Sequence, residues 1–424
     1  MKDRHAPISA KLLIFYAASI GILVGLVSVI YYYLLKSGTN TVWQRLSDND
    51  RLSHYAWIIT TLGGFLVGLT VRYLGASEGM GEVIEEIHEK GYLDHKKIPG
   101  MLAASLISLI AGSSVGPEAP LVDINGSIGS LIGRQLGLNK EQLRILTFCG
   151  ISAALGAFFG SPLGSAMFAL EIPHRFGLEY YEAFIPVVVS AIVGFFVFRF
   201  STGLTIGGQY KNPYHYHSTK LLYSRDIIYA IFIGMICAAV AILFLAIFRL
   251  TGRIISPLKK KNPILLNTLG GLGLGIAAFF VPLSLFFGEE QIQTILDQGT
   301  QMGLKSLLVL LLIKILTISL SVYSGFRGGF IFPVFFIGIT LGTIIAILFP
   351  AIPPTLALIC STAALAAALI KTPVSMIIIV SVISGQSIIP FITVSVFTSL
   401  LLTIPVGMIT TQKPRPKIEN TAGP

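Results

Sequence analysis

The chain has 424 residues, of which 54% are hydrophobic and only 12% are charged, and its mean hydropathy is +0.80. A soluble domain carries roughly 25% charged residues, so this composition excludes a soluble globular protein and predicts a polytopic membrane protein. Each spanning helix needs about 20 apolar residues, which leaves room for around ten crossings. The net charge of +10 arises from basic residues in the termini and short loops, a distribution that indicates membrane topology rather than nucleic-acid binding.

Glycine and proline are frequent, with 43 and 21 residues. In membrane helices these residue types indicate close packing, re-entrant segments and interrupted helices. The three cysteines, Cys149, Cys237 and Cys360, lie in apolar helical context with no CxxC pair and no metal-ligand partner. They are interpreted as small core residues, and no metal or cofactor is expected.

The first apolar segment runs from Leu12 to Leu35. It is too long for the hydrophobic region of a signal peptide and lacks a convincing cleavage site, so it is interpreted as the first spanning helix. Basic residues flank the apolar region at both ends of the chain: Lys2, Arg4, Lys11, Lys413, Arg415 and Lys417. The positive-inside rule predicts that both termini are cytoplasmic, in a plasma membrane or bacterial inner membrane.

Further helices are expected in chain order through two halves, residues 1–201 and 202–412, followed by a short cytoplasmic tail at 413–424. In the first half they are Trp57 to Tyr73, Glu82 to Lys90, Ile98 to Ile110, Leu121 to Ile132, Ile145 to Phe159, Leu163 to Glu171 and Ala183 to Phe200. In the second half they are Ile227 to Leu250, Leu265 to Leu285, Gly288 to Gln298, Leu304 to Tyr323, Val334 to Phe349, Leu356 to Ile370, Val374 to Ile383 and Ile388 to Met408. The polar segment between the halves, with His215 and His217, is expected outside and in solvent.

The segment Gly112–Pro120 breaks a membrane-length apolar stretch and places the carboxylate of Glu118 at the first turn of the next helix. Ionisable groups at membrane depth are costly and indicate an ion pathway. The N-terminus of a broken helix offers free N–H donors and a partial positive charge, which attract anions. The alternative is a packing break with a capping acid.

The chain also repeats itself. Gly116, Pro120 and Gly129 recur as Gly329, Pro333 and Gly342 at an offset of 213; Cys149, Ala153, Ala157 and Pro162 recur as Cys360, Ala364, Ala368 and Pro373 at 211; Glu82, Ile84 and Ile87 recur as Glu290, Ile292 and Ile295 at 208. Copies that begin on opposite sides of the membrane form an inverted repeat, whose binding site lies near the midplane between paired broken helices. Two helix N-termini are therefore expected to converge on one anion.

With these motifs placed, the chain resembles the CLC chloride channel and transporter family, in its short bacterial branch without CBS domains. The segment Gly116-Pro117-Glu118-Ala119-Pro120 is similar to the family's G-[KR]-E-G-P signature, and the segment Gly328-Gly329-Phe330-Ile331-Phe332-Pro333 is similar to its G-x-F-x-P signature. The segment Gly75–Glu82 is a degraded form of a third, G-S-G-I-P-E. The resemblance covers about residues 10 to 405, nearly the whole chain.

This resemblance implies a CLC-type inverted repeat of broken and tilted helices and a homodimer with one anion pore in each subunit. It implies that Glu118 gates the pore, because a carboxylate at a helix N-terminus mimics the permeant anion until an anion or a proton displaces it. The anion-binding residues it implies are Ser77, Gly116, Ala119, Phe330 and Ile331. The expected partners are chloride or another small anion, possible protons, membrane lipid and a second copy of the chain.

Four departures from the family pattern bear on function. Pro117 replaces a basic residue and removes an N–H donor beside the gate. Either Ser77 or Glu78 stands where a serine is expected to bind the central anion, and an ionised Glu78 would repel it. No tyrosine follows Tyr323, so the family's pore tyrosine has no counterpart. Ile172 stands where proton-coupled members carry an internal glutamate, which favours an anion channel, with a chloride or fluoride/proton antiporter as the alternative.

Other charged residues have two interpretations each. Glu171 pairs with His174 or Arg175, or belongs to an inner proton pathway. Lys314 snorkels or pairs, or lends positive potential to the inner anion path. Arg327 attracts anions at the vestibule or is solvated, and Asp123, about 140° around the helix from Glu118, is interpreted as structural.

An intramembrane hydrolase needs a nucleophile and a base at membrane depth. All seven histidines lie in tails, loops or helix ends, so the chain is not expected to be an enzyme.

Overall fold

The computed structural model describes residues 8–44, 52–77, 79–175, 177–179, 181–204, 224–259, 262–385 and 388–413. Within these ranges the chain forms helices, and its strand-like pairing consists of two isolated bridges. The all-α prediction is therefore confirmed for the part that the structure describes. Glu78, His215 and His217 lie outside these ranges.

The first half contains every helix expected from the sequence. Its elements are α1 (Ala10–Thr39), η1 (Asn40–Gln44), α3 (Leu52–Leu74), α4 (Met80–Lys90), η2 (His95–Lys97), α5 (Ile98–Ile110), α6 (Glu118–Gln135), α7 (Lys140–Phe159), α8 (Pro162–Glu171), η3 (Tyr181–Ala183) and α9 (Phe184–Thr202). The second half has α10 (Ser224–Lys259), α11 (Pro263–Phe280), η4 (Pro282–Ser284), α12 (Glu289–Met302), α13 (Leu304–Ser324), α14 (Ile331–Leu348), α15 (Pro354–Ile370), α16 (Pro373–Ser384) and α17 (Ile389–Leu402). The last helix ends six residues earlier than expected, and the chain from Thr403 to Lys413 is non-helical.

Eight of the described helices are long and apolar enough to cross a membrane, and α15, α16 and α17 are shorter apolar helices. Many large apolar side chains point outward from them, among them Phe15, Ile30, Leu62, Phe200 and Ile254. Such a surface is unfavourable in water and is expected against lipid. The chain is a multi-pass membrane protein.

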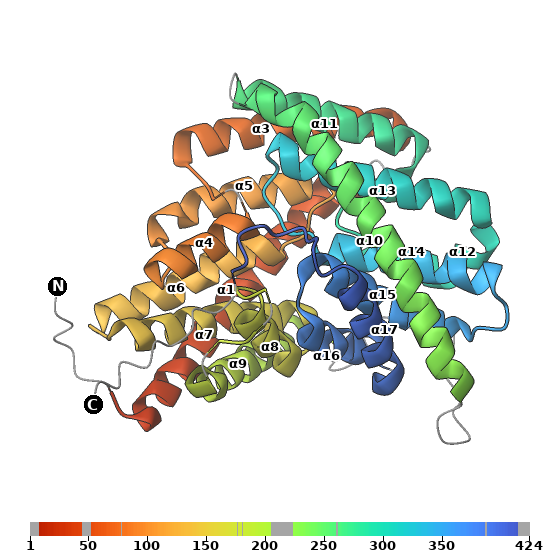
Figure 1. Cartoon of the computed structure of the whole chain (residues 1–424). Helices are drawn as coiled ribbons and strands as arrows, with labels where there is room; N and C mark the ends of the chain where they lie inside the picture. The colour runs from red at the N-terminus through yellow and green to blue at the C-terminus, as the bar shows by residue number, and fades with distance from the viewer. Residues whose placement is uncertain are drawn as a thin grey trace.

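The two halves face each other across the molecule, red to yellow-green on one side and green to blue on the other (Figure 1). Helices α7 and α15, called the central helices below, are almost completely buried, and every residue of α15 from Thr355 to Ile370 is buried. Glycines allow the neighbouring helices to approach these two closely. A Cβ on Gly129 of α6 would overlap the backbone of α7, and one on Gly342 of α14 would lie 2.5 Å from the Cα of Leu358 in α15.

The repeat found in the sequence is visible in matching hydrogen bonds. The hydroxyl of Ser190 donates to the carbonyl of Cys149 at 3.0 Å, and the hydroxyl of Ser395 donates to the carbonyl of Cys360 at 3.4 Å. Cys149 and Cys360 are one of the residue pairs that the sequence aligned at an offset of 211. The two halves therefore hold their central helices with the same contact.

Both central helices end in a left-handed residue followed by a new helix that starts with proline. Gly160 ends α7 with a φ of 65°, and Lys371 ends α15 with the same φ. Lysine is uncommon in this conformation. Its ammonium group is held by the carbonyl oxygen of Thr403 at 2.6 Å and by the hydroxyl oxygen of Thr403 at 2.9 Å.

Candidate anion site at the paired helix breaks

The two helix breaks meet through their backbones. The N–H of Gly116 donates to the carbonyl of Gly329 at 2.7 Å, and the N–H of Gly329 donates to the carbonyl of Gly116 at 2.6 Å. These are the glycines that the sequence aligned at an offset of 213. The expected convergence of the two breaks is therefore present in the structure, and α6 and α14 both begin beside this pair.

A serine hydroxyl from each half accepts a hydrogen bond from the backbone of the helix break in the other half. The N–H of Ser114 donates to the hydroxyl of Ser321 on α13 at 3.1 Å, and the N–H of Arg327 donates to the hydroxyl of Ser108 on α5 at 2.9 Å. Ser108 and Ser321 are 213 residues apart, as are Ser114 and Arg327. The two bonds are thus related by the same internal symmetry as the glycine pair.

Glu118 places its carboxylate at this junction and is fully buried. Its Oε1 accepts a hydrogen bond of 2.6 Å from the N–H of Phe332, in the first turn of α14. Its Oε2 has no hydrogen-bond partner among the described residues. A Cβ on Gly116 or Gly329 would overlap this carboxylate, so glycine is required at both positions for it to lie there.

The first N–H groups of a helix have no acceptor inside the helix and carry a partial positive charge. At this junction the first turn of α14 directs such a group at the carboxylate of Glu118, which itself opens α6. The carboxylate therefore occupies a position in which a small anion would find the same donor. This geometry supports anion binding, and it equally satisfies the definition of a capping acid.

Aromatic side chains cover the site. The ring of Phe332 lies 5.3 Å from that of Phe159, 5.8 Å from that of Phe287 and 6.1 Å from that of Phe335, measured between centroids. All four belong to the main apolar core or pack against it. Such a wall excludes water from the carboxylate, and electrostatic interactions are stronger in the low dielectric that results.

Most residues expected to bind the anion lie at the junction. Gly116 forms the backbone pair, Ala119 follows Glu118 in α6, and Phe330 and Ile331 begin α14. The N–H that reaches Glu118 comes from Phe332, which the sequence interpretation missed. The second helical residue is a usual recipient of a side-chain cap, so helix-capping geometry could have identified it.

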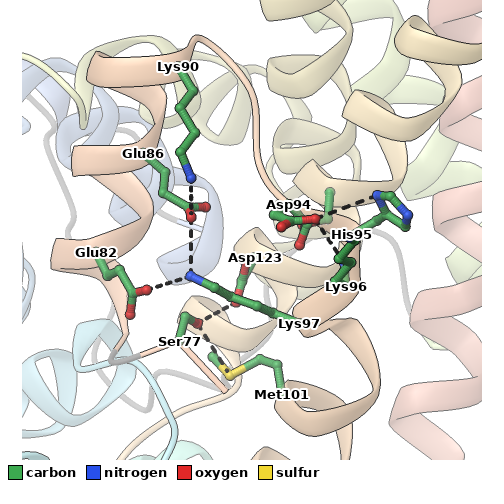
Figure 2. A network of polar contacts seen from close by, with 11 residues as sticks. Ser77, Glu82, Glu86, Lys90, Asp94, His95, Lys96, Lys97, Met101 and Asp123 are labelled. Atoms are coloured by element: carbon green, nitrogen blue, oxygen red, sulfur yellow. Dashed lines mark hydrogen bonds and ion pairs between the residues drawn. The ribbon is translucent and has the colours of Figure 1, made fainter. Parts of the chain in front are cut away.

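Ser77 lies in the loop before α4 rather than at the glycine pair. Its hydroxyl donates a short hydrogen bond to Oδ2 of Asp123 and also lies 3.7 Å from Sδ of Met101 (Figure 2). Asp123, interpreted above as structural, is therefore the direct partner of a residue expected to bind the anion. Both side chains are buried, with 2% and 3% of their surface exposed.

Glu171 does not pair with His174. Its Oε1 accepts from the N–H of Val374 at 3.1 Å, and its Oε2 accepts from the N–H and the hydroxyl of Ser375 at 3.0 and 2.8 Å. The expected ion pair with His174 is wrong because Nε2 of His174 contacts Glu179 at 2.7 Å. Glu171 caps α16, in the second half of the chain.

Ile172 follows Glu171 and is buried, and its carbonyl accepts a hydrogen bond of 2.9 Å from Nε2 of Gln412. Thr411 donates from its hydroxyl to the carbonyl of Gly81 in α4 at 2.9 Å. The last described segment, residues 408–413, therefore packs between α4, α8 and α15. Nothing in its composition indicated this position, because its contacts are all made with distant parts of the chain.

Lys314 is fully buried on α13. Its ammonium group donates to the carbonyls of Ser284, Leu285 and Phe286 at 3.1, 3.2 and 2.6 Å. The ring of Phe286 lies 5.1 Å from that of Trp43. Trp43 lies in η1, which follows the C-terminal end of α1. Glu171 and Ile172 lie on the other side, where Arg144 and Glu179 pair near the start of α7. Lys314 is therefore separated from Glu171 and Ile172, and the inner pathways suggested for these residues stay predictions.

Comparison with known proteins agrees with this architecture. A family model described as voltage gated chloride channel matches residues 63–403. The ion-transport protein YfeO of Escherichia coli O1:K1 / APEC is 27% identical over 418 residues, covering 95% of this chain and 96% of that protein.

Two solved structures share the fold. The X-ray structure of a slow cyanobacterial Cl-/H+ antiporter has a TM-score of 0.80 at 19% identity and covers 94% of this chain and 95% of its own. The structure of a CLC-type fluoride/proton antiporter has a TM-score of 0.79 at 22% identity and covers 95% and 98%. Since the family model spans the helices that build the junction, the chain belongs to the CLC family and is one of its anion transporters.

Proposed function

We propose that each subunit moves a small anion, chloride in the first instance, across the membrane through the junction of α6 and α14, and that Glu118 gates this path. The observation that carries the proposal is the hydrogen bond from the N–H of Phe332 to Glu118, at a point where two helix N-termini meet. A carboxylate and a halide compete for the same donors, so the side chain must leave for an anion to bind.

Protonation offers a second way to empty this position. A neutral carboxylic acid is a weaker acceptor than a carboxylate and no longer competes through charge. The released N–H of Phe332 then becomes available to the anion, and neighbouring first-turn amides of Ala119 and Ile331 add donors. Glu118 in this scheme responds both to the anion concentration and to pH.

A proton-coupled antiporter is the second candidate. It is favoured by the titratable group at the junction and by the two structures that share the fold, both of which are antiporters by their titles. The channel is favoured by Ile172, which cannot carry a proton at the position expected for the internal glutamate. We further propose a homodimer with both termini on the cytoplasmic side.

Paired flux measurements distinguish the two candidates. Purified protein in liposomes is given a chloride gradient, and chloride efflux and external pH are recorded together for the native chain and for Glu118→Ala. A channel is expected to release chloride with no uphill proton movement, and Glu118→Ala is expected to conduct without the pH dependence of the native chain. An antiporter would drive protons against their gradient, and Glu118→Ala would abolish that movement.

The same vesicles are tested with fluoride and nitrate, because the altered serine motif leaves the preferred anion open. Glu141→Gln serves as a control, since Glu141 is an exposed acid on the first turn of α7. Absence of flux for every small anion would refute the proposal.

A further inference from the structure

The loop that carries Ser77 is pressed against the helices that follow it. A Cβ on Gly100 of α5 would overlap the carbonyl of Gly75, so the loop backbone lies directly on that helix. This position buries Ser77 against Asp123 of α6 and Met101 of α5 (Figure 2). The contact therefore joins the loop before α4 to the same helix that begins with Glu118.

The hydroxyl of Ser77 has one proton to donate. In the structure that proton is directed at Asp123, and the other neighbour within reach, Sδ of Met101, is also an acceptor. A hydroxyl in this state presents only lone pairs elsewhere, and an ionised Asp123 beside it repels anions. The geometry seen is therefore unsuited to holding an anion at Ser77.

We propose that Asp123 is a proton-operated switch for the Ser77 hydroxyl, and this inference rests on the proposed anion transport. When a proton from solvent binds Oδ2 of Asp123, the carboxylic acid donates to the Ser77 oxygen. The hydroxyl group of Ser77 keeps its proton but no longer donates it to Asp123, so it can donate a hydrogen bond to the anion. Ionised Asp123 holds the hydroxyl and closes the site; neutral Asp123 opens it.

The charged groups near Asp123 on α4 and η2 form ion pairs with one another. Lys97 Nζ lies 2.5 Å from Glu82 and 3.1 Å from Glu86, and Lys90 Nζ lies 3.1 Å from Glu86. Two acids and two lysines balance in this cluster, which Figure 2 shows beside Asp123. Glu118 is the remaining acid on the same helix, five residues earlier. Among the described residues, the titratable group that contacts Ser77 directly is thus Asp123.

Anion binding measured without transport tests the switch. Chloride and fluoride are titrated by calorimetry into purified protein carrying Glu118→Gln, between about pH 5 and pH 8, so that the gate does not titrate. Affinity is expected to rise as pH falls, by at most about tenfold per pH unit, because one proton is linked to binding. Adding Asp123→Asn is expected to remove this pH dependence and hold the affinity at its low-pH value, since the amide N–H donates to Ser77 permanently.

Two further variants separate the switch from a general charge effect. Glu86→Gln removes a nearby carboxylate without touching Ser77 and is expected to retain the pH dependence. Ser77→Ala in the Asp123→Asn protein is expected to lower the anion affinity at every pH. A pH dependence that survives Asp123→Asn, or an affinity unchanged by Ser77→Ala, would overturn the inference.

A measurement on protein that keeps Ser77 and Asp123 tests the switch even if the variants at these two positions misfold. Addition of chloride to weakly buffered Glu118→Gln protein near neutral pH is expected to take up as much as one proton per subunit. Chloride binding with no proton uptake and no pH dependence refutes the switch but leaves the transport proposal intact. Absence of chloride and fluoride binding at every pH, together with absence of flux, refutes both.

Discussion

Glu171 at the end of α8 accepts hydrogen bonds from both the backbone N–H and the hydroxyl of Ser375 at the start of α16. The relation parallels the one at the junction, where Glu118 accepts a hydrogen bond from the first turn of α14. In both cases an acid of the first half satisfies the N-terminus of a helix in the second half. Substitution of Glu171 can therefore test the contribution of such a contact to stability, and substitution of Glu118 can test its contribution to transport.

We predict that Glu171→Ala destabilises the protein by about 1–3 kcal/mol, because the first amides of α16 lose their acceptor in a buried place. Glu171→Gln is expected to lose less, since one oxygen remains. Thermal unfolding in detergent measures both, with the exposed Glu182→Gln as a control. Unchanged stability together with altered proton movement would instead support an inner proton pathway through Glu171.

Gly329→Ala is predicted to be coupled to Glu118. The added methyl group would overlap the carboxylate of Glu118 and lie 2.9 Å from the backbone nitrogen of Ala119. We expect a loss of about 1–3 kcal/mol in stability, which is usual for overpacking, and a smaller loss when Glu118→Ala is already present. A double-mutant cycle on unfolding midpoints measures this coupling.

Gly81→Ala is the matched control for that cycle, because a Cβ there would meet only the hydroxyl of Thr411 at 3.7 Å. It should leave stability and its dependence on Glu118 unchanged. Additive losses for Gly329→Ala and Glu118→Ala would show that the carboxylate spends most of its time elsewhere.

The Glu179 cluster predicts acid sensitivity. Burial alone would raise the pKa of Glu179, but hydrogen bonds from His174 and Arg144 outweigh it and hold the pKa below its ordinary value. A group with a depressed folded pKa contributes stability above its unfolded value of about 4.3, and this contribution is lost as pH falls through the folded pKa. Melting temperature is therefore expected to drop as the pH falls below about 4.3.

Glu179→Gln should be less stable than the native chain near neutral pH and should show a weaker loss of melting temperature on acidification. The neighbouring exposed acid offers a control, because Glu182→Gln should keep the native pH profile. Equal profiles for the native chain and Glu179→Gln would contradict the assignment.

Lys314→Met is predicted to lower the free energy of unfolding by about 2 kcal/mol or more, because two buried carbonyls and one partly buried carbonyl lose their donor. Anion affinity is expected to stay within about twofold in the folded fraction, since the ammonium group is already occupied by Ser284, Leu285 and Phe286. Lys305→Met, at an exposed position of the same helix, is the control. A large fall in affinity without loss of stability would restore a role for Lys314 in the anion path.

The sequence was sufficient to predict that the glycines, the prolines and the single acid mark two converging helix breaks. These residues act on the local backbone, and most of them recur in both halves of the chain. Gly116 and Gly329 stand at one offset, and backbone convergence needs no side chain. The partners of Ser77 and Glu171 could not be predicted, since each depends on which distant segment packs against it. Asp123 was correctly separated from Glu118 by helical angle, but that argument says nothing about the loop on the opposite face.

Lys371 stands in a similar position. It stands 211 residues after Gly160, and both residues end a helix, but the partners of its ammonium group lie on Thr403, 32 residues further along the chain. The sequence repeat thus predicted where the helix ends, but it did not predict the hydrogen bonds to Thr403 that stabilise this helix end.

The reciprocal hydrogen bonds between Gly116 and Gly329 join the two halves of the chain at the junction. A transporter that rocks its halves apart around the substrate would have to rupture both bonds in every cycle. Only a substitution to proline would delete one of these bonds directly, because both partners are main-chain groups and proline lacks the N–H donor. Under the proposed function, an anion would therefore pass the junction through rotations of single side chains, and the turnover rate should follow side-chain release rather than movement of whole helix bundles.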